Sequence, residues 1–225
     1  MPTQGYQRQP WVISALLILT ILTLFIVPLF PVDWLNRFYT VSFSAIFLCA
    51  AYALRGNKSL LFRISLLIVL VTGIHAFLSE GSYKSIGRII QFIFFLLLVV
   101  FLISQIAASP EVTGQVIMDA VVAYLLLGIA FGVIVLMVDT TVPGAYSEPM
   151  VMRTSSGEKP DIRNALYYAF VTYTTTGYGD LTPRHPVSRS LSVLISISGQ
   201  LYVAIILALL VGKFASRNVS SKNDP

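Results

Sequence analysis

The run TTTGYGD, from Thr174 to Asp180, has residue types suited to binding a cation through the backbone. A ring of backbone carbonyl oxygens can replace the hydration water of an alkali cation. Successive carbonyls face the same way only with backbone angles that a β-carbon resists, and Gly177 and Gly179 relieve that restriction. The Thr175 hydroxyl can add an oxygen below the carbonyls, and the Tyr178 ring can brace the run from behind.

A glycine-rich turn in a loop is the alternative interpretation of this run. However, the run follows a short apolar and aromatic segment and precedes a long apolar helix, Pro186–Phe214. Irregular backbone at membrane depth is tolerated only where it is buried in protein or lines a cavity. The flanking sequence therefore favours a re-entrant pore loop.

The run resembles the selectivity filter of potassium channels. The resemblance implies that K⁺ is the permeant ion and that its oxygen ligands come from Thr175, Thr176, Gly177 and Tyr178. It also implies a set of residues that support the filter, namely Gly179, Asp180, Tyr167 and Tyr168. The last two stand where the family carries an aromatic pair that hydrogen-bonds toward the filter tyrosine; ordinary interfacial tyrosines are the alternative.

Val171 occupies the position at which some members of this family carry a buried glutamate bonded to the aspartate that ends the filter. Asp180 is therefore left with Tyr167 or water as its partner. We expect the inactivation behaviour to differ from that of relatives that carry the glutamate.

The composition is that of a membrane protein. Of 225 residues, 56% are hydrophobic and 11% are charged, whereas soluble domains carry about 25% charged residues. The net charge is +5, and in a membrane protein an excess of Lys and Arg indicates loops that set topology and contact lipid headgroups. No basic soluble segment suggests nucleic-acid binding. The single cysteine, Cys49, excludes an intrachain disulfide.

The apolar runs predict an all-α membrane protein with six transmembrane helices. The predicted spans are Trp11–Phe30, Phe38–Leu54, Leu60–Leu78, Ile86–Ala107, Val116–Val138 and one within Pro186–Phe214. Trp11 and Trp34 are expected to anchor the first span at the interfaces. Asp139–Pro160 predicts a polar outer loop, and Asp161–Thr174 a pore helix too short to span. The negative end of its macrodipole would face a cation in the filter.

These spans predict a four-helix transmembrane domain at 1–110, a pore domain at 111–216 and a short cytoplasmic tail at 217–225. The connection from Arg55 to Arg63 and the C-terminal tail carry the clearest excess of basic residues. The positive-inside rule therefore places both termini in the cytoplasm, and we expect a multi-pass protein of the plasma membrane.

The fourth span does not have the charge pattern of a voltage sensor. Such a helix needs several arginines at every third position, since each transferred charge supplies about 2.3 kcal/mol per 100 mV. Here Arg88 is followed at intervals of three by Gln91, Phe94 and Leu97. The first four helices therefore resemble a voltage-sensor scaffold without its charges, and strong voltage gating is not expected.

The sixth span contains the candidates for gating. Gly199 lies where inner helices of the family often carry a hinge glycine, and a hinge and a close helix contact are equally favoured. By the resemblance, one helical face lines the central cavity and the lower gate, namely Gln200, Val203, Leu207 and Val211. Gly128 and Gly132 of the fifth span predict a surface for close packing of a neighbouring helix.

Four ionisable residues are further candidates. Histidine as a residue type titrates near neutral pH, so His75 and His185 are candidates for tuning gating by protons, although a plain interfacial role is the alternative for each. Arg88 and Asp119 lie within or beside spans, where ionisable residues are functional candidates by default.

The sequence carries one copy of the run Thr174–Asp180, which we call the filter run. One filter run supplies one wall of an ion path. Four-fold symmetry closes a ring of carbonyls, so the resemblance implies a homotetramer in a lipid membrane. We expect passive K⁺ conduction, with no enzyme activity, organic cofactor, organic substrate or nucleic-acid partner. The alternatives are a less selective cation channel, a potassium transporter and a regulatory subunit that does not conduct alone.

Overall fold

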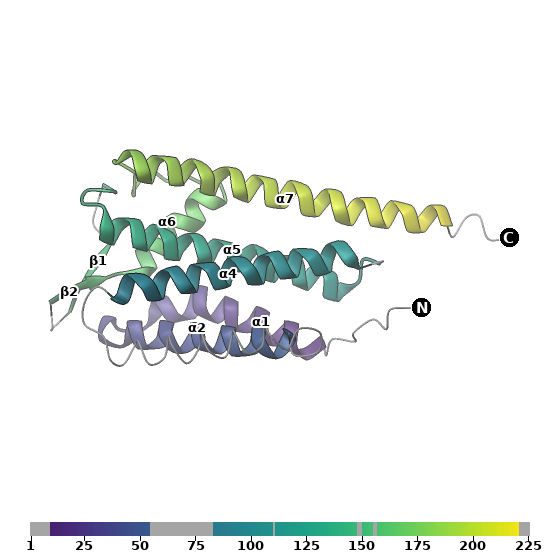
Figure 1. Ribbon diagram of the computed structural model, residues 1–225, viewed down its shortest axis with the longest axis horizontal. Coiled ribbons are helices and arrows are strands. Elements are labelled where there is room, and N and C mark those ends of the chain that lie inside the picture. The colour runs from purple at the N-terminus through teal and green to yellow at the C-terminus, as the bar shows by residue number, and fades with distance from the viewer. Residues whose placement is uncertain (1–9, 55–82, 110, 148–149, 155–156, 221–225) are drawn as a thin grey trace. The chain divides into compact units, whose positions relative to one another are not determined.

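The computed structural model describes residues 10–54, 83–109, 111–147, 150–154 and 157–220 (Figure 1). The helices are α1 Pro10–Ile21, η1 Leu22–Ile26, η2 Val27–Leu29, α2 Val32–Leu54, α4 Tyr83–Ala108, α5 Gly114–Thr141, α6 Ile162–Tyr173 and α7 Pro186–Ser220. Two short strands, β1 Val151–Thr154 and β2 Gly157–Pro160, pair in one sheet. The chain divides into two compact units, Met1–Phe94 with Met152–Lys159, and Phe95–Val151 with Pro160–Pro225.

Within the described residues, four helical segments are long and apolar enough to cross a membrane. They are Trp11–Leu29, Gly87–Ala108, Gly114–Thr141 and Pro186–Phe214. These segments match the first, fourth, fifth and sixth predicted spans, so the chain is a helical membrane protein. The second predicted span contains a shorter apolar stretch, Arg37–Ala50. The third, Leu60–Leu78, lies outside the described residues, as does the basic connection from Arg55 to Arg63.

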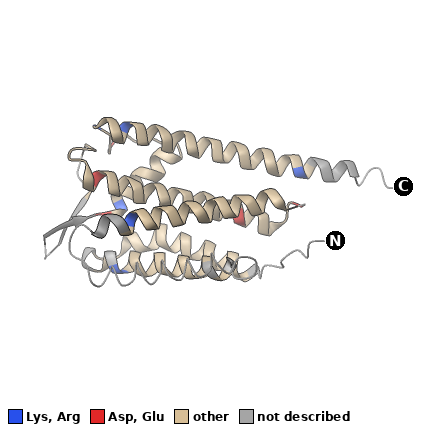
Figure 2. Ribbon diagram, viewed as in Figure 1, with Lys and Arg blue, Asp and Glu red and all other residues tan. Residues whose placement is uncertain are grey.

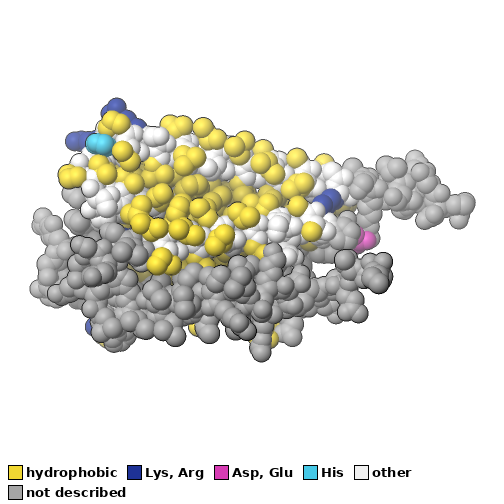
Figure 3. Space-filling model, viewed as in Figure 1, with side chains coloured by type: hydrophobic (Ala, Val, Ile, Leu, Met, Phe, Trp, Pro, Cys, Tyr) yellow, Lys and Arg dark blue, Asp and Glu magenta, His cyan; other side chains and the backbone are white. Residues whose placement is uncertain are grey.

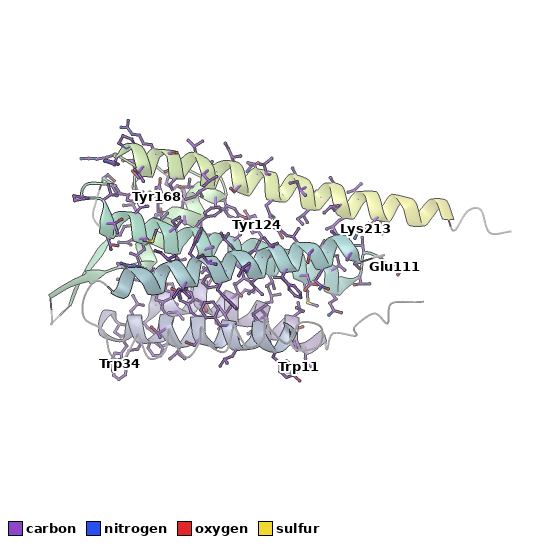
Figure 4. The ribbon with its side chains drawn as sticks, in the orientation of Figure 1. Trp11, Trp34, Glu111, Tyr124, Tyr168 and Lys213 are labelled. Carbon is purple, nitrogen blue, oxygen red and sulfur yellow. The ribbon has the colours of Figure 1, made fainter. Side chains whose placement is uncertain are left out.

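The first unit is built around α1 and α2, which pack against each other. The rings of Trp11 and Tyr52 lie with their centroids 5.3 Å apart, and the Cys49 thiol is 3.5 Å from the carbonyl oxygen of Val12. Trp11 and Trp34 are both exposed and lie at opposite ends of this unit (Figure 4). This arrangement fits the two interfacial anchors that the sequence predicts.

In the second unit, α6 packs closely against α5 at two glycines. A Cβ added at Gly128 would lie 2.4 Å from Cζ of Phe170, and one added at Gly132 would lie 2.4 Å from Cδ2 of Leu166. On both helices the partners are four residues apart, which places them on one face. The predicted small-residue surface therefore receives the short helix that precedes the filter run.

The start of α6 is fixed to the end of α5 by hydrogen bonds. Asp139 Oδ2 accepts from the Met150 amide at 3.0 Å, and the Met150 carbonyl accepts from the Asp161 amide at 2.6 Å. Asp161 then caps α6, because its Oδ1 accepts from the Arg163 amide at 3.0 Å. The Arg163 guanidinium lies 2.9 Å from Asp161 Oδ2. These bonds set where α6 begins.

The loop after the filter run is held to the segment that follows α5. Tyr146 and Pro183 form an isolated antiparallel bridge, and the Ser147 amide donates to the Thr182 carbonyl at 2.8 Å. The Ala145 carbonyl accepts from the Arg184 amide at 2.8 Å and from Ser188 Oγ at 2.5 Å. Hydrogen bonds therefore hold the segments before and after the filter run to the end of α5 and to the residues that follow α5.

Helix α7 leaves much of its apolar surface uncovered by its own chain. In its spanning window 22% of residues are buried, compared with 67% in α5. The large exposed apolar residues of its middle and far end are Val193, Leu194, Ile197, Leu201, Val203, Ile205, Leu207, Val211 and Phe214. Figure 3 shows a broad hydrophobic surface in this region. The charged residues described on α5 and α7 lie toward the helix ends (Figure 2).

Lys213, near the far end of α7, caps the C-terminal end of α4 (Figure 4). Its Nζ donates to three carbonyl oxygens, at 2.5 Å for Ile106, 3.0 Å for Ala107 and 2.5 Å for Ser109. A cation is favoured at this position because the last carbonyls of a helix lack intrahelical donors and carry the negative end of the macrodipole.

The contact at Gly128 yields the first prediction. Gly128→Ala would overpack the ring of Phe170, three of whose atoms lie within 3.0 Å of the added Cβ. We expect a loss of about 1–3 kcal/mol in the free energy of unfolding, measured by denaturant titration in detergent micelles. The matched control is Gly114→Ala in the same helix, where no atom lies within 4 Å. An equal effect of the two substitutions would contradict the contact.

Candidate functional site

In the filter run, residues with a positive φ angle alternate with residues that do not have one. The φ angles of Gly177 and Gly179 are +57° and +81°, as the sequence analysis expected for these glycines. Thr175 also has a positive φ, of +58°, and it is the only non-glycine among the described residues that does. Positive φ therefore recurs at every second residue. The conformation is unfavourable for a β-branched residue, so neighbouring contacts must hold Thr175 in place.

Hydrogen bonds fold the run back over the last turn of α6. The amide of Thr175 donates to the Thr172 carbonyl at 3.0 Å. The amides of Thr176 and Gly177 both donate to the Val171 carbonyl, at 2.9 Å and 3.2 Å. These three amides are thereby satisfied by carbonyls at the C-terminal end of α6.

The same bonds determine where the carbonyls of the run point. In a planar trans peptide, the C=O of one residue points opposite to the N–H of the next. The amides of Thr176 and Gly177 point to α6, so the carbonyl oxygens of Thr175 and Thr176 point away from it. These are two of the four residues that the sequence analysis predicts as K⁺ ligands.

The threonine side chains of the run are also engaged. Thr174 Oγ1 donates to the Phe170 carbonyl at 2.8 Å and lies 2.9 Å from Thr176 Oγ1. Gln200 of α7 donates from Nε2 to Thr175 Oγ1 at 3.4 Å. Thr175 therefore presents a hydroxyl at the end of the run nearest to Gln200, where the sequence analysis expects an additional oxygen.

Tyr167 and Asp180 close the other end of the run. The Tyr167 hydroxyl donates to Asp180 Oδ2 at 2.7 Å, which confirms one of the two partners expected for this carboxylate. The bond lowers the pKa of Asp180 and raises the pKa of Tyr167. A lowered pKa means that the bond contributes to stability above the ordinary pKa of aspartate and is lost as the pH falls through the lowered value.

Tyr168 has a hydrogen-bond partner in α7. Its hydroxyl shares a 2.5 Å hydrogen bond with Ser192 Oγ of α7, and its ring packs edge-on against Tyr146 at 4.9 Å. Tyr168 therefore braces α6 against α7 within one chain, and its bond toward Tyr178 stays a prediction. The Tyr178 ring itself is 72% exposed.

The predicted cavity-lining residues lie on the uncovered side of α7. Gln200, Val203, Leu207 and Val211 are all exposed. Gly199 differs because it is buried against the end of α6. Thr175 and Gln200 thus come together, whereas the apolar residues of this face are exposed among the residues that the structure describes.

The other ionisable candidates have separate positions. His185 Nδ1 accepts from the Val187 amide at 3.2 Å at the start of α7, which is a structural role at a helix terminus. Asp119 is buried in α5. Arg88 is half-buried in α4, and its Nε has no hydrogen-bond partner among the described residues. His75 lies outside the described residues.

Comparison with known proteins points to ion channels, as the resemblance of the filter run does. Residues 121–216 match a family model described as "Ion channel", so this segment is similar to ion channel domains. The chain is also similar to a protein named "Two pore potassium channel c" from Oryza sativa subsp. japonica, with 32% identity over 89 residues. That match covers 40% of this chain and 17% of the length of the relative. No solved structure matches the chain. The two matches support the potassium channel family.

The bond between Tyr167 and Asp180 yields the second prediction. Tyr167→Phe removes the donor, so the pKa of Asp180 should rise toward its ordinary value and its carboxylate should take up a proton at higher pH. The titration can be followed by ¹³C NMR of labelled aspartate, with Asp180→Asn to assign the signal. The matched control is Tyr168→Phe, whose hydroxyl bonds Ser192. An Asp180 pKa that stays at its wild-type value in Tyr167→Phe would refute the pairing.

Proposed function

We propose that this protein is a potassium-selective channel that conducts K⁺ passively through a pore formed by four copies of the chain. The observation that carries the proposal is the backbone of the filter run, in which positive φ recurs at Thr175, Gly177 and Gly179. Amides directed to α6 leave carbonyls directed away from it. Carbonyls, together with the Thr175 hydroxyl, are the ligands that replace the hydration shell of K⁺ in such filters.

The proposed ion ligands are the carbonyls of Thr175, Thr176, Gly177 and Tyr178. Gly179, Asp180, Tyr167 and Tyr168 support them, the last through Ser192. The C-terminal end of α6 adds negative electrostatic potential at the site, because the filter run folds over that end and the macrodipole is negative there. The site thus attracts a cation without a carboxylate among its ligands.

Two observations support the proposed tetramer. Each copy of this sequence carries one filter run, and one run cannot surround an ion. The run and the apolar face of α7 are exposed in the single chain. Rotation about a four-fold axis would supply a closed ring of ligands and would cover apolar surface with copies of itself.

The remaining parts of the proposal concern topology and gating. The proposal includes a pore domain at 111–216 and a four-helix domain at 1–110, and both termini would be cytoplasmic in a plasma-membrane protein. Arg88 is the only basic residue in the described span of α4, Gly87–Ala108. A single such charge supports a channel that is not strongly voltage-gated.

The third prediction tests ion selectivity. The full chain in liposomes should carry K⁺ and exclude Na⁺, with a planar-bilayer reversal potential that follows the K⁺ gradient. Gly177→Val should lose K⁺ over Na⁺ selectivity, because a β-branched residue at a φ of +57° is strained by about 1–3 kcal/mol in every copy.

The matched control is Gly144→Val. Gly144 has a φ of +69° and, like Gly177, no atom within 4 Å of an added Cβ, but it lies outside the filter run. This variant should keep its selectivity. A wild-type reversal potential that follows Na⁺ as well as K⁺ would indicate a less selective cation channel. Absence of flux from the wild-type chain would favour a non-conducting subunit, and flux driven by a coupled gradient would favour a transporter.

A further inference from the structure

We infer that one turn of α7, Ser196–Gln200, is a positioning element for the filter, and that Gly199 within it is a contact residue and not a hinge. We name this segment the filter-contact turn. The inference rests on the proposed function and concerns which residues set the geometry of the filter. It separates the two roles that the sequence leaves equally open for Gly199.

Gly199 allows the backbone of α7 to touch the last residue of α6. A Cβ added at Gly199 would lie 2.1 Å from the carbonyl oxygen of Tyr173, 3.0 Å from its carbonyl carbon and 2.9 Å from Cδ2 of its ring. Real Cβ atoms do not approach other atoms to 2.1 Å, so one of the two backbones would have to move. Rotation of a side chain cannot relieve this contact, because its closest partner is a main-chain atom.

Two hydrogen bonds extend the contact on either side of Gly199. Ser196 Oγ donates to the Thr172 carbonyl at 3.4 Å, and Gln200 Nε2 donates to Thr175 Oγ1 at 3.4 Å. Both bonds are long, and the weight of the argument therefore rests on the backbone contact. Together the three residues of α7 touch positions 172, 173 and 175, which lead directly into the filter.

Tyr173 cannot retreat from this contact without disturbing α5. Its side chain is fully buried, and its ring centroid lies 4.6 Å from that of Tyr124 and 5.7 Å from that of Phe131. Its hydroxyl has no hydrogen-bond partner among the described residues, so packing alone holds the ring. Tyr173 is therefore enclosed by α5 on one side and by Gly199 on the other.

A displacement of Tyr173 would affect the predicted ion ligands, because the first of them, Thr175, lies two residues further along the chain. The Thr172 carbonyl accepts from the Thr175 amide at 3.0 Å, and Thr175 has a positive φ that only its contacts maintain. A shift at the end of α6 therefore changes the conformation of the first predicted ligand. By contrast, Gly212 of the same helix has no atom within 4 Å of an added Cβ, so it has the space that a hinge requires.

The experiment compares Gly199→Ala with the matched control Gly212→Ala in the purified, full-length chain. Potassium that binds the folded filter stabilises the protein by mass action, so the unfolding midpoint should be higher in K⁺ than in Na⁺. A purely structural defect lowers both midpoints equally. A displaced filter reduces the difference between them.

We expect Gly199→Ala to reduce the K⁺-minus-Na⁺ difference in midpoint to less than about half of the wild-type value, and Gly212→Ala to preserve it. In planar bilayers Gly199→Ala should also lower the permeability ratio of K⁺ to Na⁺. A hinge would give the opposite pattern, with fewer openings of Gly199→Ala but an unchanged permeability ratio and midpoint difference. That pattern would overturn the inference.

The double variant Ser196→Ala/Gln200→Leu decides the question if Gly199→Ala does not fold. It removes the two hydrogen bonds at the ends of the filter-contact turn and adds no atom at the contact itself. We expect a smaller loss of the midpoint difference, and an unchanged difference would count against the inference. If the wild-type chain itself shows neither a midpoint difference nor K⁺ flux, the proposed function fails before the role of Gly199 is tested.

Discussion

The planar trans peptide unit is the constraint on which the rest of the site depends. It places each carbonyl opposite the next amide, so a backbone can present oxygens on one side only if its amides are satisfied on the other. The Val171 carbonyl satisfies two of these amides and the Thr172 carbonyl a third. The end of α6 therefore has to lie at one position. The Asp161 cap holds the start of that helix, and the two glycines of α5 hold its middle and its last turn.

Support for the run comes from different chemistry at its two ends. Near Asp180 it is polar and exposed, with the Tyr167 hydroxyl on the carboxylate and the bridge between Tyr146 and Pro183 behind it. Near Thr175 the support comes from close packing of a buried residue, Tyr173, which is enclosed between α5 and Gly199. Acid should therefore affect the first end before the second, since protonation of Asp180 removes an acceptor charge there and leaves the packing of Tyr173 unchanged.

The sequence predicted the features that depend on residue type, and it missed several that depend on a distant neighbour. The positive φ angles at Gly177 and Gly179 and the helix at Asp161–Thr174 could be read directly. The positive φ of Thr175 could not, because a threonine gives no local sign of it, although the period of two continued backward from the glycines would have reached it. The bond of Tyr168 to Ser192 joins residues 24 apart in the chain, and the space around Gly199 depends on the residue that faces it.

Lys213 has a mechanical consequence. Its ammonium holds three carbonyls at the end of α4, and hydrogen bonds to a charged group are worth about 1.5–3 kcal/mol each. A displacement of the far end of α7 that left the end of α4 behind would break all of them in one step. The lower-energy movement carries both ends as one body, so a force applied to either helix is transmitted to the other through the Lys213 side chain.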